Sequence, residues 1–225
     1  MDATTAVEVD LDATGRSVVR RMHCEAPLLV RVADEPGPGV TLLLVGGAAG
    51  PLGGDRLRFD LRVGAGCLVV VRSVAAALAQ PGPRGEHSEL DVEITVGAQA
   101  TLDWSPEPTV SVIGSDHRVR LRLAVDATGT TAFTERISLG RHAEAGGRLA
   151  LRQRVEIAGD AVLDHETVFQ PGALSGPGAH GPWRSVDSTV VIGCELPEPT
   201  AHVSATCARA VMHLSARCAL VTTLR

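Results

Sequence analysis

The sequence predicts a mostly β protein, built as a β-helix-like stack of antiparallel and parallel strands with one or two helices near its C-terminal end. One pattern carries this fold class: an alternating strand, a tight Gly/Ala turn and a second strand, used four times. The turns recur about every 30 residues, a spacing typical of stacked repeats or regular hairpins. Because the repeat length is irregular, an ordinary antiparallel β-sandwich is the alternative.

The first copy shows why each element is expected. Leu57, Phe59, Leu61 and Val63 alternate with charged residues over 56–63, the period of a strand with one buried face. A glycine-rich turn at 64–66 leads into 67–71. The other copies alternate over 89–94, 118–123 and 148–157, turn at 97–98, 126–129 and 158–160, and resume through 102–104, toward Phe133 and through 162–163.

The C-terminal region is expected to depart from this pattern. Residues 171–183 are rich in Gly and Pro and predict a loop, either a mobile one or an interaction loop that presents His180 and Trp183. Apolar residues then recur at helical spacing over 200–215, with Thr200 as a suitable N-cap, which predicts an amphipathic helix docked on the sheet. Residues 219–224 fit a strand or a frayed end.

Composition limits the domain count and the function class. A chain of 225 residues that is 44% hydrophobic can bury one core, so we expect a single domain over 1–225. Aromatic residues make up only 2%, the net charge is −5 and the charges are dispersed, which argues against nucleic acid. All 21 basic residues are arginine, so a Walker-type phosphate loop and a Schiff-base lysine are excluded.

Targeting signals are not expected. The first residues lack the basic and apolar regions of a secretory signal, and the longest apolar stretch, at 42–50, is too short to span a bilayer. We therefore expect a cytoplasmic protein without membrane contact. The five cysteines form no C-x-x-C pair, which argues against a disulfide framework or a structural zinc site, and Cys67 is expected to be buried.

Acidic and histidine residues give the candidates for chemistry. In a strand, Asp164 and Glu166 would share one face while His165 points to the other. This arrangement allows a paired-carboxylate site or two solvated carboxylates. Other metal-binding donors are Met22-His23-Cys24 and His142 with Glu144, which lack the repeated spacing of a metal site. No nucleophile motif is present, so we expect no catalytic residues.

Three ordered stretches resemble the UreD/UreH family of urease accessory proteins. The turn at 50–55, Gly50-Pro51-Leu52-Gly53-Gly54-Asp55, leads into the first copy of the pattern. The stretch 97–108 is similar to the family's G-A-x-L-x-W-L-P-Q-P, and 135–141 is similar to its E-x-x-x-L-G-R. The resemblance covers roughly residues 16–170; the segment 72–78 and the region after Pro171 depart from it.

This resemblance implies a non-enzymatic scaffold of β-helix-like architecture. Such a scaffold joins a helical UreF-type accessory protein and a UreG-type GTPase to urease apoprotein and gives nickel a protected path. Nickel would pass transiently, with no tightly bound cofactor. Glu135 and Glu166 are the candidates to line the path, because weakly binding carboxylates suit an ion that must leave again.

Five further residues are structural or interface candidates: Gly53, Gly54, Asp55, Gly140 and Arg141. Asp55 follows two glycines, where a short acceptor can cap a turn, and Arg141 can pair with Glu135 or with a partner's carboxylate. Two rival functions stay open. One is a β-solenoid carbohydrate-binding or hydrolytic protein that uses Asp164 and Glu166, and the other is a purely structural β-repeat protein.

Overall fold

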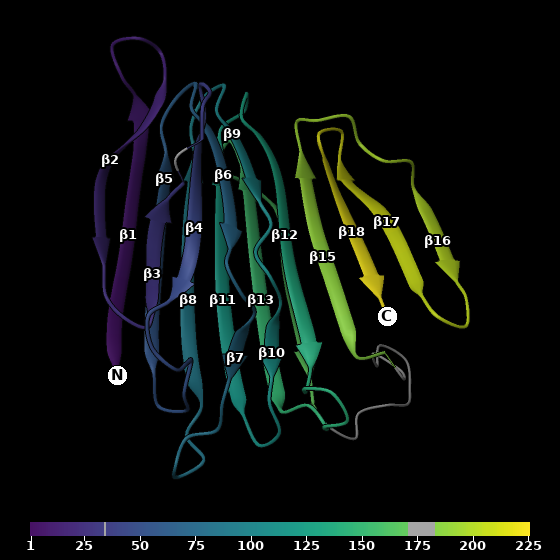
Figure 1. The fold of residues 1–225 in the computed structure, drawn as a ribbon. Helices are drawn as coiled ribbons and strands as arrows, with labels where there is room; N and C mark the ends of the chain where they lie inside the picture. Colours follow the sequence, from purple (N-terminus) through teal and green to yellow (C-terminus); the bar gives the residue numbers. More distant parts are fainter. Residues whose placement is uncertain (34, 171–182) are drawn as a thin grey trace.

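Two β-sheets lie face to face in the computed structural model, which describes residues 1–33, 35–170 and 183–225 (Figure 1). Within these residues every regular element is a strand. The prediction of a mostly β, stacked fold is confirmed. The predicted loop 171–183 lies outside the described residues, apart from Trp183 at its end.

The first sheet, called sheet A, has seven strands. In spatial order they are β14 (Asp160–Phe169), β13 (Arg148–Ile157), β11 (Asp116–Val125), β8 (Ser88–Val96), β5 (Arg56–Val63), β1 (Asp2–Leu11) and β2 (Ser17–Cys24). The run from β1 to β13 is parallel throughout, whereas β2 and β14 pair antiparallel at the two ends. Parallel ladders of this length exclude an ordinary antiparallel sandwich.

The second sheet, called sheet B, has eleven strands. Its main path is β16 (Thr200–Val203), β17 (Ala208–Ser215), β18 (Cys218–Leu224), β15 (Ser185–Ile192), β12 (Thr130–Leu139), β9 (Thr101–Trp104), β6 (Leu68–Ser73), β4 (Val40–Gly46) and β3 (Leu28–Val32). The short strands β7 (Ala77–Ala79) and β10 (Thr109–Ser111) attach beside β12. The central run from β4 to β12 is parallel, with antiparallel strands at both ends.

The first three copies of the sequence pattern each cross from sheet A to sheet B. Each crossing uses four residues between the strands, closed by a backbone hydrogen bond from the fourth residue to the first, as in Cys67 N to Gly64 O at 3.2 Å. The turns also bond to one another, with Gly66 N donating to Ala98 O at 2.8 Å. The chain therefore winds as a two-sided coil whose turns stack.

The fourth copy turns back within sheet A instead of crossing. Only Ala158 and Gly159 separate β13 from β14, and both have positive φ values, of 54° and 90°. Two adjacent residues with positive φ make the tight hairpin turn that matches the twist of antiparallel strands. The same sequence pattern thus gives a crossing when the connection has four residues and a hairpin when it has two.

The core lies between the inner faces of the two sheets. It is mainly aliphatic, as expected from the composition, and it includes Cys67, which is fully buried. Three of the five aromatic residues of the chain meet here: Trp104 stacks on Phe133 with ring centroids 5.2 Å apart, and Phe59 lies 5.6 Å from Trp104. Burial of these large side chains stabilises the middle of the stack.

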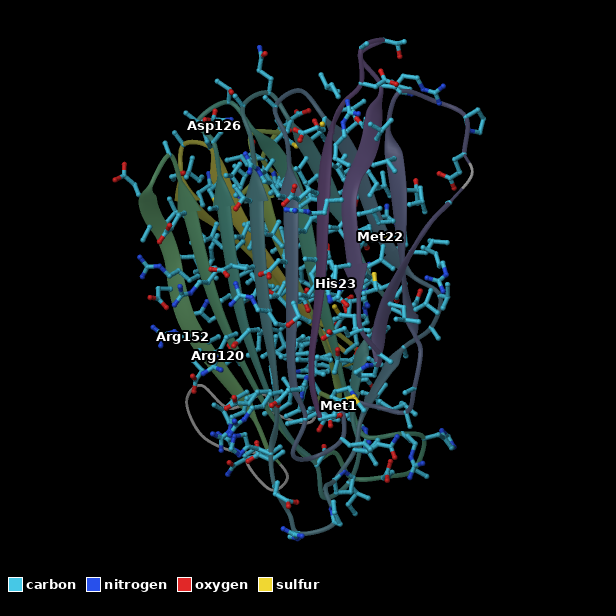
Figure 2. All side chains as sticks on the ribbon, turned by 90° about the vertical axis from the view of Figure 1, so that its left-hand side faces the viewer. Met1, Met22, His23, Arg120, Asp126 and Arg152 are labelled. Carbon is cyan, nitrogen blue, oxygen red and sulfur yellow. The ribbon has the colours of Figure 1, made fainter. Side chains whose placement is uncertain are left out.

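The outer face of sheet A carries a network of ion pairs. Arg120 of β11 bonds to Asp91 at 2.6 Å, and Arg152 of β13 bonds to Asp164 at 3.2 Å. Arg120 and Arg152 are neighbours in register on this face (Figure 2). Arg120 forms its ion pair with β8 on one side, and Arg152 forms its ion pair with β14 on the other. Opposite charges on neighbouring strands support the parallel register, although exposed pairs of this kind contribute little each.

The helix predicted over 200–215 is wrong, because this segment forms the hairpin β16–β17. The Ser204 side chain accepts hydrogen bonds from Thr206 N and Cys207 N, which stabilises the turn between the strands. Strand β17 then pairs along β18, and β18 shows that 219–224 lie in a strand. The backbone hydrogen bonds that β17 makes along β18 stabilise a strand here more than the helical spacing of the apolar residues would stabilise a helix. In the part of the chain that the structure describes, no helix is long and apolar enough to cross a membrane.

Candidate functional site

Two cavities lie between the sheets, with volumes of about 470 and 170 Å³. Of the described residues, Glu135 alone lines both of them. The larger cavity is mostly apolar and lies beside Trp104 and His117. The smaller one combines apolar residues with Gln153, His165 and other polar side chains. We therefore place the centre of the candidate site at the Glu135 carboxylate, which borders both cavities.

Strand periodicity directs Glu135 inward. In β12 the buried residues Thr131, Phe133, Ile137 and Leu139 lie on the inward face, and the partly buried Glu135 occupies the inward position between Phe133 and Ile137. Phe133 pairs with Trp104 at the end of β9, while Ile137 pairs with the start of β10. Glu135 thus lies where the ladder beside β12 is interrupted, so a cavity can form there.

Among the residues that the structure describes, one hydrogen bond from a neutral donor holds the Glu135 carboxylate. Trp104 Nε1 donates to Glu135 Oε1 at 2.8 Å. The neighbouring Arg136 bonds instead to the Pro106 carbonyl at 2.7 Å, and no ion pair to Glu135 is found among the described residues. Burial raises the pKa of Glu135 to about 7, and the Trp104 hydrogen bond and the Arg136 charge offset only part of that effect.

The smaller cavity has a polar wall with unpartnered atoms. Gln153 pairs in register with His165, and Ser188 pairs with Glu135. Gln153 is 1% exposed, yet its Nε2 has no hydrogen-bond partner within the described residues, and the same holds for His165 Nδ1. Buried polar atoms normally have partners, and the volume is several times the share of one water molecule, about 30 Å³. Waters or a polar ligand fit this cavity.

His117 adds an imidazole to the wall of the larger cavity. Its ring is 1% exposed, and its Nδ1 lies 2.9 Å from the Ser88 hydroxyl oxygen. Burial lowers the pKa of His117 to about 4, so the ring is neutral at physiological pH. A neutral imidazole held through one nitrogen can offer the other to a borderline metal ion such as nickel.

The interior donors are spread along the cavities rather than gathered. No group of three or more His, Cys, Asp or Glu residues that could hold a metal ion occurs over 1–33, 35–170 and 183–225. The lining residues of the two cavities include no cysteine, so no thiolate is available there to trap a soft ion. This arrangement can offer single weak ligands but not a tight metal site.

The acidic candidates on β14 lie outside the cavities. Asp164 and Glu166 are exposed on the outer face of sheet A, and His165 points inward from between them. Asp164 accepts bonds from Arg152 and Arg154, and these bonds lower its pKa. Glu166, proposed from the sequence as a second path residue, therefore does not face the interior in this structure.

The turn at 50–55 is held by close backbone packing. A Cβ on Gly53 would lie 2.3 Å from the Glu86 carbonyl oxygen, and Gly54 has a positive φ of 93°. Asp55 is 5% exposed; its Oδ2 accepts from Leu52 N at 2.9 Å and its Oδ1 from the Met1 amino group at 2.8 Å.

The second glycine element, after β12, is packed in the same way. Gly140 has a φ of 77°, and a Cβ there would lie 2.5 Å from the Glu144 carbonyl oxygen. Arg141 bonds to the Glu144 carboxylate at 2.8 Å and not to Glu135, because it lies on the exposed loop beyond the strand. This pairing holds the pKa of Glu144 down to about 2.

The remaining donors are peripheral. Met22 and His23 lie on β2, at the edge of sheet A (Figure 2), and His23 pairs with Glu25 at 3.3 Å. The segment 72–78 begins with an Arg72 to Asp103 pair at 2.6 Å and continues into exposed Val74 beside the larger cavity. Neither region supplies a ligand cluster.

Sequence reasoning missed three inward polar residues: His117, Gln153 and Ser188. It placed His165 on the face opposite Asp164 and Glu166 but gave it no role. Each of the three missed residues occupies a position where the strand alternation calls for an apolar side chain, as Gln153 does between Leu151 and Val155. That break in the pattern was a usable signal, because a polar residue on a buried face needs a partner or a cavity.

Comparison with known proteins identifies close similarity to one family. The family model described as UreD urease accessory protein matches residues 3–224. The urease accessory protein UreD of Streptomyces coelicolor is 37% identical over 216 residues, which cover 94% of this chain and 85% of that protein. The UreD of Frankia alni is 38% identical, covering 83% of this chain and 68% of that protein.

A further relative differs in length. The urease accessory protein UreD of a Parafrankia species is 40% identical over 155 residues, covering 69% of this chain. The matched part is 52% of that protein, so the chain aligns with about half the length of this relative.

Proposed function

Because the chain belongs to the UreD family of urease accessory proteins, with a role in urease maturation, we propose that it acts as a non-catalytic scaffold in that process. In this proposal it recruits a helical UreF-type protein and a UreG-type GTPase to urease apoprotein, and it assists the delivery of nickel to the urease active site. The absence of lysine supports a separate GTPase chain, because a phosphate loop needs that amine.

The observation that carries the nickel part of the proposal is the interior carboxylate. Glu135 lines both cavities, has one neutral hydrogen-bond donor and has no ion pair in the described chain. A lone carboxylate binds a divalent ion weakly, and such an ion can move on if the next donors are equally weak. Nickel is the cargo here, and no tightly bound cofactor is proposed.

The carbohydrate-binding or hydrolytic alternative has less support. It depends on Asp164 and Glu166, but Asp164 is engaged by two arginines that hold its pKa down. A carboxyl group with a lowered pKa is a poor general acid near neutral pH. The family and relative names also suggest a maturation role rather than catalysis.

Co-purification tests the scaffold proposal. A tagged copy is expressed with its urease genes, and with the same genes lacking the helical accessory protein. Recovery of urease subunits and the GTPase only in the complete set is the expected result. A protein that purifies alone from the complete set would contradict recruitment and redirect attention to sugar-binding and hydrolysis assays.

Urease activation tests the nickel proposal. Glu135→Ala is expected to lower nickel-dependent activation by about tenfold or more, the scale of losing a group at a metal site, while the complex still co-purifies. The matched control is Glu166→Ala, which removes an exposed carboxylate from the outer face. Equal activation by the two variants would contradict the proposal, and collapse of the complex with Glu135→Ala would give Glu135 a structural role instead.

A further inference from the structure

Two separate sequence stretches meet at one hydrogen bond inside the stack. Trp104 lies at the end of β9 and Glu135 in β12, 31 positions apart, and Trp104 Nε1 donates to Glu135 Oε1 at 2.8 Å. No other hydrogen bond to this carboxylate is found among the described residues. The indole N–H therefore bonds to one oxygen, and Oε2 has no partner in the described part of the protein.

The indole ring is itself held rigidly. Trp104 is 4% exposed and lies between two other buried aromatic rings. It stacks on Phe133 with an interplanar angle of 11°, and Phe59 lies against it at 59°. The chain has only three Phe, two Trp and no Tyr, so most of its aromatic side chains are placed around this donor. Packed rings fix the direction in which the N–H points.

The position of the pair relative to the cavities gives the bond a role beyond stability. Trp104 lines the larger cavity, whereas Glu135 lines both. A group that reaches into two spaces can rotate toward either unless it is restrained. Partners that hydrogen-bond to a metal-binding carboxylate orient it and raise metal affinity, commonly by about 10 to 100-fold.

We propose that Trp104 is a positioning residue for Glu135: its indole N–H fixes Oε1 and so presents Oε2 to a divalent cation in transit between the two cavities. This inference rests on the proposed function, because it assumes that Glu135 binds the cation. It assigns Trp104 no contact with the metal. It also gives a physical reason for the Trp of one stretch and the Glu of the other to occur together.

The test removes the N–H and keeps the ring. Trp104 is replaced by benzothienylalanine, which carries sulfur in place of the indole N–H, in a Trp183→Phe background so that only one site is labelled. The matched control is the Trp183→Phe protein with ordinary tryptophan. The measurements are calorimetric titration with Ni²⁺ alone and the infrared carboxylate bands of the metal-free protein.

The expected result is Ni²⁺ binding weakened by about tenfold or more, with a shifted Glu135 carboxylate band, since both oxygens are then free of the indole. The band is assigned by its loss in Glu135→Gln. Unchanged affinity and an unchanged band in the benzothienylalanine protein would overturn the positioning role. Trp104→Phe is a second variant with the same expected loss of affinity, and it covers the case in which the labelled protein does not fold.

Glu135→Gln separates the two proposals. If this variant binds Ni²⁺ as tightly as the unmodified protein, Glu135 is not a nickel ligand and the proposed path fails at its centre. If it binds weakly while the benzothienylalanine protein binds normally, the path stands and only the role of Trp104 is lost.

Discussion

Glu135 and Asp164 are both carboxylates on strands, but they face different surroundings. Glu135 lies on the inner face of sheet B, and Asp164 lies on the outer face of sheet A. Glu135 faces a cavity with one neutral donor, and burial raises its pKa to about 7. Asp164 is exposed beside two arginines, and its pKa is lowered. The difference shows that the face of the strand decides the state of a carboxylate in this fold. On the outer face the carboxylate is solvated and paired with arginine, whereas on the inner face it has no ion pair and its pKa lies near neutral pH.

A second interior carboxylate should be the most damaging change. Gln153→Glu places a charge on a residue that is 1% exposed and lines the same small cavity as Glu135. An unpaired buried charge costs about 3 to 5 kcal/mol, so we expect a loss of this size in the free energy of unfolding at pH 8. Urea denaturation measures it, with Gln153→Leu as an uncharged control. Equal stability of the two variants would show that the cavity is as well solvated as the surface.

Removal of the interior charge should stabilise the protein at high pH. The folded-state pKa of Glu135, about 7, is above its ordinary value of 4.5. The contribution of Glu135 to stability is therefore fully present below pH 4.5 and is lost as pH rises through about 7. Glu135→Gln should raise the free energy of unfolding by roughly 2 to 3 kcal/mol at pH 8 and by little at pH 4.5. A difference independent of pH would contradict the isolated carboxylate.

His117 should act in the opposite pH direction with a similar or smaller effect. Its folded-state pKa, about 4, is below the ordinary 6.5, so stability is present above pH 6.5 and is lost as pH falls toward 4. His117→Gln should remove up to roughly 2 kcal/mol of this acid sensitivity, although the loss of the Ser88 contact lowers stability at every pH. Thermal melts from pH 7 to pH 4 measure the slope, and a variant with the same slope would refute the assignment.

The exterior carboxylate should matter least. Asp164→Asn removes bonds to two exposed arginines, and surface ion pairs contribute little to stability. Because the pKa of Asp164 is lowered, its contribution is present above the ordinary value of 3.8 and is lost as pH falls below that value through the folded-state pKa. The change in melting midpoint at pH 7 should be the smallest of the four. A fall in melting midpoint as large as that of an interior variant would contradict the proposed difference between the inner and outer faces.

Alternation made much of the fold and part of the site predictable. It placed Asp164 and Glu166 on one face and His165 on the other, as the structure shows. It could not say which face is inside, because β14 is an edge strand with charged residues on one side and only partly buried residues on the other. Alternation alone therefore allows Glu166 an interior position, whereas the structure places it on the exposed outer face of sheet A.

The hairpin at β16–β17 shows a different limit. The apolar residues of 200–215 satisfy helical spacing, and only the free edge of β18 makes the strand alternative better. That edge is set by pairing with β15, far back in the chain, so no local pattern reports it. The turn at 158–159 was easier to predict than the hairpin but harder than the alternation, because its two-residue length can be read from the sequence only once the strand ends are known.

The antiparallel strands at the ends of each parallel run also limit where the stack can gain or lose coils. β2 and β14 close sheet A, while β3 and β15 close the parallel part of sheet B, so coils can be added or lost only between these terminators. Each inserted coil would lengthen the space between the sheets by one strand spacing, about 4.8 Å. The stack can therefore grow or shrink only by whole coils, each of which adds one strand to each sheet.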